Sequence, residues 1–436
     1  MQHTRQPCRN EVITRRAGLE ACMPCPGIRS GWRDQAEMDL VGGLSSGASL
    51  KTRWVIPIIG AFFVSSLTAC VSVGGLYSAP GDTGRPAEEW LLRQRAEHEQ
   101  RAMEEQGLIY EDEQLEHYLT QLARSLQPPE VRKGTSFRVK VIKNTSADAL
   151  SFPNGALYIT TGMLARLENE AQLAILLAHE MTHCNNEHAL RALRYCRETV
   201  SAGSKLYGPG RGGQVPGALQ WGTSPPALEA YLEELELDAD RGALQLVLRA
   251  GFDATEGLKL IECQQRDLDK EDLEEASRSA LHRHLEKRRE SWRMLLDRWT
   301  QSEPRRLADR ETYVAQVHRV ILDNALLDER RGRFSLAERE VENYLAVRPN
   351  DESAYYLLGE ICRQRGLLSD RSKAKKCYAK AISIRPYYAD PYRGMGLLYY
   401  KEGEKTQARM SFQAYLSHAP AAPDKAYIEK YLTTCN

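Results

Sequence analysis

Apolar residues recur with a helical period along most of the chain, and this pattern predicts a mostly helical protein. The segment 87–126 is rich in charge but carries one apolar stripe at i, i+3, i+4, i+7 and i+11, formed by Leu115, Tyr118, Leu119, Leu122 and Leu126. Helical patterns return over 227–250 and 256–300. Packing against a core explains such stripes without any further function.

Two short segments alternate between apolar and polar residues instead, and they predict strands. They are SFRVKVI at 136–142 and GALYITT at 155–161. Pro153-Asn154-Gly155 supplies a turn directly before the second strand. The pattern as a whole therefore predicts an α+β fold, mostly α, with a small β-sheet.

The segment 174–188, AILLAHEMTHCNNEH, predicts one buried helix. His179 and His183 lie one turn apart on its same face, where two imidazoles can share one metal ion. Glu180 lies beside that face and could reach a metal-bound water, as in an HExxH metalloprotease helix. An ordinary half-buried histidine pair is the alternative that the spacing leaves open. His188 lies about 180° around this helix from His179, so we expect a structural role for it rather than a role as a ligand.

The C-terminal part of the chain, 311–436, repeats itself with a period of 34 residues, apart from a short insertion near 367–371. The alignment pairs Tyr355, Leu358, Gly359, Ala374, Tyr378, Ala381 and Pro386 with Tyr392, Met395, Gly396, Ala408, Phe412, Tyr415 and Pro420. This spacing predicts tetratricopeptide repeats, an α-helical solenoid. Stacked helix pairs of this kind present a concave surface for peptides or protein partners.

The N-terminal part carries signals of processing rather than of a fold. Residues 1–49 have no apolar periodicity and predict a disordered extension or a start codon placed too early. Residues 50–69 combine a basic start, a short apolar run and a small-residue end, as a signal peptide does. Leu-x-Ala-Cys at its end resembles the bacterial lipobox, which would make Cys70 a lipidated N-terminus followed by a tether over 70–95. A signal anchor or a buried apolar helix is the alternative.

Length and composition limit the function classes. The 436 residues suggest two or three domains, and the hydrophobic (42 %) and charged (27 %) fractions are those of a globular chain. Lys+Arg and Asp+Glu are both 59, which argues against a general nucleic-acid binder. Ten cysteines without a paired CxxC framework indicate neither a disulfide scaffold nor a structural zinc ribbon.

Three segments together resemble peptidase family M48, the HtpX/BepA-like gluzincin metallopeptidases: NTSADALSFPNGALYITTGML, LLAHEMTHCNNEHA and YLEELELDADRGA. The resemblance implies a metallopeptidase domain over 96–300. It also implies one Zn²⁺ per chain, with Glu236 as third ligand beside His179 and His183, and Asp240 as the carboxylate that orients a ligand histidine.

The same resemblance implies one further site residue, and the proposed mechanism adds the others. LHRHLEKR at 281–288 is similar to the family's Thr-His-Pro segment and aligns His282 with a histidine near the zinc, although Arg283 replaces the usual proline. His282 would stabilise the oxyanion or occupy the open zinc position in a latent state. Glu180 would be the general base. Ala156, Leu157, Tyr158, Ile159 and Thr160 would form the edge strand to which a substrate adds.

The combined pattern predicts a zinc metalloendopeptidase of the bacterial cell envelope that hydrolyses misfolded or unassembled envelope proteins. We expect a lipid-anchored protein on the periplasmic side of the outer membrane, because Val71 rather than Asp follows Cys70. The repeats would bind protein substrates or outer-membrane assembly machinery, with no nucleic acid involved. One alternative is a chaperone or assembly factor with a latent protease site. Another is a scaffold lipoprotein with an inactive site, against which the complete set of His179, Glu180, His183 and Glu236 argues.

Overall fold

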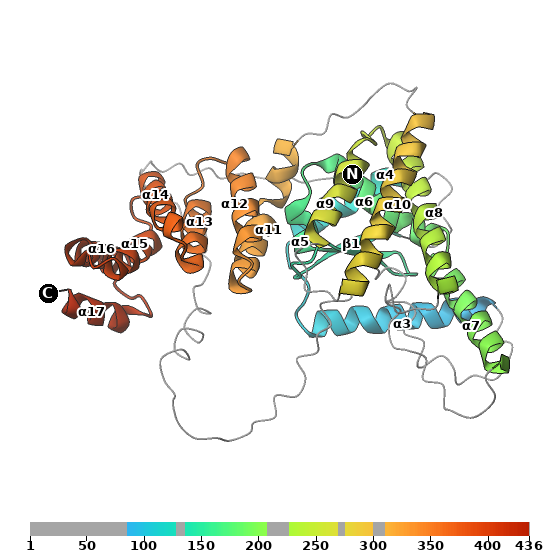
Figure 1. Ribbon diagram of the computed structural model, residues 1–436, viewed down its shortest axis with the longest axis horizontal. Helices are drawn as coiled ribbons and strands as arrows, with labels where there is room; N and C mark the ends of the chain where they lie inside the picture. The colour runs from blue at the N-terminus through green and yellow to red at the C-terminus, as the bar shows by residue number, and fades with distance from the viewer. Residues whose placement is uncertain (1–84, 128–135, 207–225, 269–274, 300–309, 436) are drawn as a thin grey trace, which may run out of the picture.

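The computed structural model describes residues 85–127, 136–206, 226–268, 275–299 and 310–435. This part of the chain is mostly helical with one small sheet, as the sequence predicts (Figure 1). None of the helices in these ranges has both the length and the apolar character needed to cross a membrane. The expected N-terminal extension, the signal peptide at 50–69 and the lipidated Cys70 lie outside the described residues.

Two helices precede the sheet: α3 (Arg85–Glu105) and α4 (Glu113–Leu126). The first begins inside the segment 70–95, so the expected tether is wrong for residues 85–95. Gly107, with φ 66°, lies in the break between the two helices. The Asp112 side chain caps α4, and the predicted stripe is its buried face, with Leu115, Leu119, Leu122 and Leu126 all buried.

The sheet has three strands: β1 (Arg138–Ile142), β2 (Ala149–Ser151) and β3 (Ala156–Thr160). Their order is β1-β3-β2, with β3 parallel to β1 and antiparallel to β2. Gly155, with φ 86°, closes the turn between β2 and β3. The expectation that Ala156–Thr160 is an edge strand is therefore wrong. Three residues of β2 are too few to show a periodic pattern, so the sequence did not reveal the strand that covers β3.

A layer of helices follows the sheet: α5 (Thr161–Arg166), α6 (Glu170–Asn185), α7 (His188–Leu206), α8 (Pro226–Ala250), α9 (Glu256–Leu268) and α10 (Glu275–Trp299). All residues of α6 from Ala171 to His183 are buried, because strands and helices surround it. The predicted single helix over 174–188 is wrong at its end. It stops at Asn185, Glu187 takes a φ of 54°, and His188 begins a new helix.

The C-terminal helices extend away from the sheet as three successive pairs followed by one further helix, α17 (Figure 1). They are α11 (Arg310–Arg330), α12 (Phe334–Val347), α13 (Glu352–Arg365), α14 (Leu368–Ile384), α15 (Asp390–Lys401), α16 (Lys405–His418) and α17 (Lys425–Thr434). A Cβ added at Gly359 would lie 2.5 Å from the Tyr378 ring, and one at Gly396 would lie 2.5 Å from the Phe412 ring. These equivalent contacts fit the predicted alignment of two repeats, and the tetratricopeptide assignment itself stays a prediction.

Candidate metal centre

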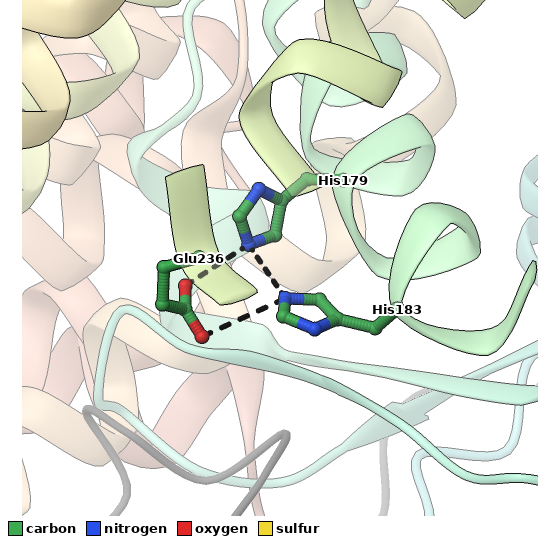
Figure 2. Close-up of side chains that lie close together, drawn as sticks. All are labelled: His179, His183 and Glu236. Carbon is green, nitrogen blue, oxygen red and sulfur yellow. Dashed lines mark hydrogen bonds and ion pairs between the residues drawn. The ribbon is translucent and has the colours of Figure 1, made fainter. Parts of the chain in front are cut away.

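Three buried side chains from two helices converge beside the sheet (Figure 2). His179 and His183 come from α6, and Glu236 comes from α8. His179 Nε2 lies 3.0 Å from His183 Nε2 and 3.3 Å from Glu236 Oε2, while His183 Nε2 lies 3.6 Å from Glu236 Oε1. The structure thus brings together the three residues that the sequence proposed as ligands.

The donor set fits a zinc ion. Zinc binds imidazole nitrogen and carboxylate oxygen at about 2.0–2.1 Å, so a tetrahedral ion holds its ligand atoms about 3.3 Å apart. The three separations in the cluster lie close to this value. Three protein ligands also leave a fourth position open, as in catalytic rather than structural zinc sites.

A carboxylate and a guanidinium hold the far side of the His179 ring. Asp240 Oδ1 lies 2.9 Å from His179 Nδ1, and Arg288 donates to both oxygens of Asp240, from Nε at 2.8 Å and from Nη2 at 2.7 Å. An ionised carboxylate can only accept, so His179 Nδ1 carries the proton of this bond. Asp240 is the partner that the resemblance implied, whereas Arg288 was named only as part of a segment.

The far side of the His183 ring is held by a residue that the sequence analysis placed elsewhere. His188 Nδ1 lies 2.9 Å from His183 Nδ1, and His188 Nε2 lies 3.1 Å from Asp238 Oδ2. The expectation that His188 points away from the cluster is wrong because the helix does not continue to it. Asn185-Asn186, two poor helix formers just before it, was the signal in the sequence that could have indicated the break.

The protonation of the metal-free cluster follows from its charges. Burial and Arg288 oppose a charge on His179, but hydrogen bonds to Asp240 and Glu236 raise its pKa to about 9. Burial lowers the pKa of His183 well below its ordinary value. His179 Nε2–H can thus donate to the bare His183 Nε2. A metal ion that binds here must displace that proton, so its affinity falls at low pH.

Glu180 follows His179 on α6 and is also buried. Burial raises the pKa of its carboxyl, against a hydrogen bond with Ser151 that lowers it. Its Oε2 atom is buried without a hydrogen-bond partner among the described residues. Glu180 also lines a cavity together with His179, Glu236, Asp240 and Arg288. A buried carboxylate of this kind is suited to hold a proton during a reaction.

A second cavity lies on the His183 side, and strand β2 connects the two. Asp148 and Ala149 line the cavity at Glu180, while Ser151 and Phe152 line the cavity at His183. Helix α3 covers this second cavity, through Leu92 among others. The edge of β2 that does not face β3 therefore runs past the cluster from one cavity to the other.

Helix α10 contributes to the site through residues other than the one proposed. Arg288 donates a hydrogen bond to Asp240. The buried His284 interacts electrostatically with Glu236 and Asp240. Burial lowers the pKa of His284 to about 4, so this ring is neutral near pH 7. His282, half-buried on the same helix, stays a prediction as an oxyanion-stabilising group.

Comparison with known proteins gives one family match. Residues 110–312, which include every residue of the cluster, match the model of peptidase family M48. Two beta-barrel assembly-enhancing proteases are similar to the chain, from Yersinia pestis and from Escherichia coli (strain K12), each 26 % identical over 160 residues. A putative beta-barrel assembly-enhancing protease of Vibrio cholerae is 26 % identical over 155 residues.

These similarities cover part of each protein. They include 33–34 % of this chain. The chain matches about a third of the length of the relatives, 31–32 %. The similarity thus supports the peptidase domain more directly than it supports the activity of the whole protein.

Proposed function

Because residues 110–312 carry a peptidase domain of family M48, we propose that this protein is a zinc-dependent endopeptidase. The observation that carries the proposal is the cluster itself. Two imidazoles and a carboxylate converge at ligand distances. Glu180, which has a buried carboxylate oxygen without a hydrogen-bond partner among the described residues, lines the adjoining cavity. The same arrangement supports the third-ligand role of Glu236.

Each residue of the site has a task in this reaction. His179, His183 and Glu236 would hold the zinc, which when bound polarises the scissile carbonyl and lowers the pKa of a water to about 7. Glu180 takes the proton of the attacking water and delivers it to the leaving nitrogen. The raised pKa of Glu180 favours the second transfer, because a more basic carboxylate keeps the proton until the amine forms.

We propose that an extended substrate pairs with the free edge of β2 rather than with β3. Main-chain hydrogen bonds to a strand edge bind a peptide largely independently of its side chains. A chain along this edge would pass from the cavity at Ser151 to the cavity at Ala149 and present a peptide bond to Glu180.

We further propose that the substrates are misfolded or unassembled proteins of the bacterial envelope, and that the C-terminal helix pairs recruit substrates or assembly factors. The support is the similarity to beta-barrel assembly-enhancing proteases and the expected lipidation of Cys70, which would place the domain on the periplasmic side of the membrane.

One observation favours a second candidate function, an assembly factor whose protease site is latent. His179, Glu180, His183 and Glu236 are only 4–7 % exposed, so a protein substrate has little access to them. In this case the cluster would cleave a substrate only after the surrounding helices and strands had moved to expose it.

The substitution Glu180→Gln tests the peptidase directly. We expect cleavage of unfolded casein by the purified protein to fall by about 100-fold or more, because the proton acceptor is lost. The zinc content by elemental analysis should stay at one equivalent per chain. Glu234→Gln, which changes an exposed carboxylate on α8, is the control and should cleave at the parent rate. Equal cleavage by Glu180→Gln and the parent would refute the proposal, and no cleavage by either would favour the latent site.

A further inference from the structure

We propose that His188 and Asp238 are positioning residues that fix the ring tautomer of His183, so that its Nε2 lone pair faces the metal position. The inference rests on the proposed zinc site. It assigns a function to a histidine and a carboxylate that are not ligands themselves.

The directions of the hydrogen bonds carry the argument. Asp238 Oδ2, as an ionised carboxylate, can only accept, so His188 Nε2 must donate across the 3.1 Å between them. A neutral imidazole has one N–H, which leaves His188 Nδ1 as an acceptor. The 2.9 Å contact between the two Nδ1 atoms then requires His183 Nδ1 to carry the proton.

The consequence appears on the opposite side of the His183 ring. With its proton on Nδ1, neutral His183 has a bare lone pair on Nε2, which is the atom 3.6 Å from Glu236 Oε1. A zinc ligand needs such a bare nitrogen. If His188 had the opposite tautomer, two N–H groups would face each other, or the His183 lone pair would face away from Glu236.

The backbone break after α6 makes this relay possible. A continued helix would place His188 about 140° around the axis from His183, because five residues at about 100° each separate them. Glu187 instead adopts φ 54°, a left-handed conformation that is unfavourable for a non-glycine residue. This turn brings the His188 ring to 4.9 Å from the His183 ring, centroid to centroid.

Asp238 is held in place by other donors besides His188. Asn186 Nδ2 donates to Oδ2 at 2.9 Å, and Arg241 Nη2 donates to Oδ1 at 3.0 Å. Asn186 comes from the helix break itself, so the break supplies both His188 and a residue that orients the acceptor of His188. The His183 ring is thus supported through two elements, as the His179 ring is supported by Asp240 and Arg288.

A pair of substitutions at one position separates tautomer control from mere packing. Asp238→Asn keeps an oxygen that can accept from His188 Nε2, whereas Asp238→Ala removes the acceptor. We expect the zinc dissociation constant, measured by competition with a chelator, to rise about 10–100-fold in Asp238→Ala. It should rise much less in Asp238→Asn. Glu234→Ala, on the exposed side of the same helix, is the control and should leave the constant unchanged.

The tautomer itself can be observed without metal. Long-range ¹H–¹⁵N spectra of the metal-free, histidine-labelled protein are recorded at about pH 10, where His179 is neutral and no longer donates to His183 Nε2. They should report Nδ1–H for His183 in the parent and in Asp238→Asn, and Nε2–H in His188→Phe. Unchanged His183 tautomer and zinc affinity in both Asp238→Ala and His188→Phe would overturn the inference, even if these variants melt at lower temperature. A parent protein that binds no zinc would refute the proposed function, while the spectra would still decide the inference.

Discussion

At the scale of single residues, the cluster depends on carboxylates that never touch the metal position. Asp240 joins the His179 ring to the Arg288 guanidinium through a bidentate pair. Although burial opposes ionisation, the Arg288 guanidinium and the His179 hydrogen bond hold the pKa of Asp240 well below its ordinary value. This carboxylate therefore stays ionised at every pH at which His179 can bind a metal.

Asp240→Asn should weaken zinc binding by about 10–100-fold, because the amide has no negative charge and turns an N–H toward an N–H donor of Arg288 where the carboxylate offered a second oxygen. The measurement is the zinc dissociation constant at pH 7. Asp297→Asn, an exposed position on α10, should bind as the parent does. Parent affinity in Asp240→Asn would show that the negative charge of Asp240 is not needed to orient His179.

The sequence predicted some residues of the site and missed others, for physical reasons. His179 and His183 follow from helical spacing alone, and Glu236 and Asp240 from a resemblance carried by a second helix. His188 was misplaced because one left-handed residue, Glu187, redirects the chain after α6. Arg288 lies on α10, and only the packing of that helix against α8 shows which of its many basic residues reaches Asp240.

At the scale of elements, the site requires α6 and α8 to approach closely, since one helix carries both histidines and the other carries Glu236. Gly242 on α8 permits this approach. A Cβ there would lie 2.4 Å from Thr182 Cγ2 and 2.6 Å from Thr182 Oγ1 on α6. Thr182 lies directly before His183, so a shift at this contact moves a ligand.

Gly242→Ala should push the two helices apart, lower stability by about 1–3 kcal/mol as overpacking does, and weaken zinc binding. The double variant Thr182→Ala/Gly242→Ala removes both clashing atoms and leaves a Cβ contact of 3.1 Å. It should recover most of the stability and affinity. Thermal unfolding and zinc competition measure the two effects. Failure of the double variant to recover either would show that the contact does not set the helix separation.

The same scale shows which elements a pattern can predict. The stripe of α4 and the alternation of β1 are periodic over several residues, and both were predicted. Strand β2 has three residues, all buried, which is too short for any period to appear. The prediction that β3 is an edge strand was wrong for this reason, because β2 pairs with the edge that β3 was expected to offer.

At the scale of the whole molecule, a buried charged cluster joins the C-terminal helices to the peptidase domain. Arg166 of α5 forms ion pairs with Asp267 of α9, Asp328 of α11 and Glu340 of α12. Asn324 of α11 donates to Glu340 and accepts from Thr161 Oγ1 at 2.9 Å. The repetition of the C-terminal sequence predicts helix pairs. It contains no information about this junction, because the residues that form the junction are far apart in the chain.

The buried charged cluster around Arg166 should make the stability of the junction depend on pH. Burial raises the pKa of Glu340 to about 7, more than Arg166 lowers it, and Asp328 adds to the rise. A carboxyl with a raised folded-state pKa binds its proton more tightly in the folded protein. Its stabilising contribution is therefore complete below about pH 4.5, the unfolded value, and is lost as the pH rises through about 7.

Glu340→Gln should remove this dependence, because the amide stays neutral and can still accept from Asn324 Nδ2. We expect the variant to gain about 1–3 kcal/mol over the parent at pH 8 and nothing at pH 4.5. Urea unfolding of both proteins across this range measures the difference, with the exposed Glu429→Gln as a control that should follow the parent. If Glu340→Gln and the parent keep a constant difference between pH 4.5 and 8, Glu340 ionises in the folded protein as it does in the unfolded chain. The ion pairs with Arg166 would then stabilise the junction without protonation of Glu340.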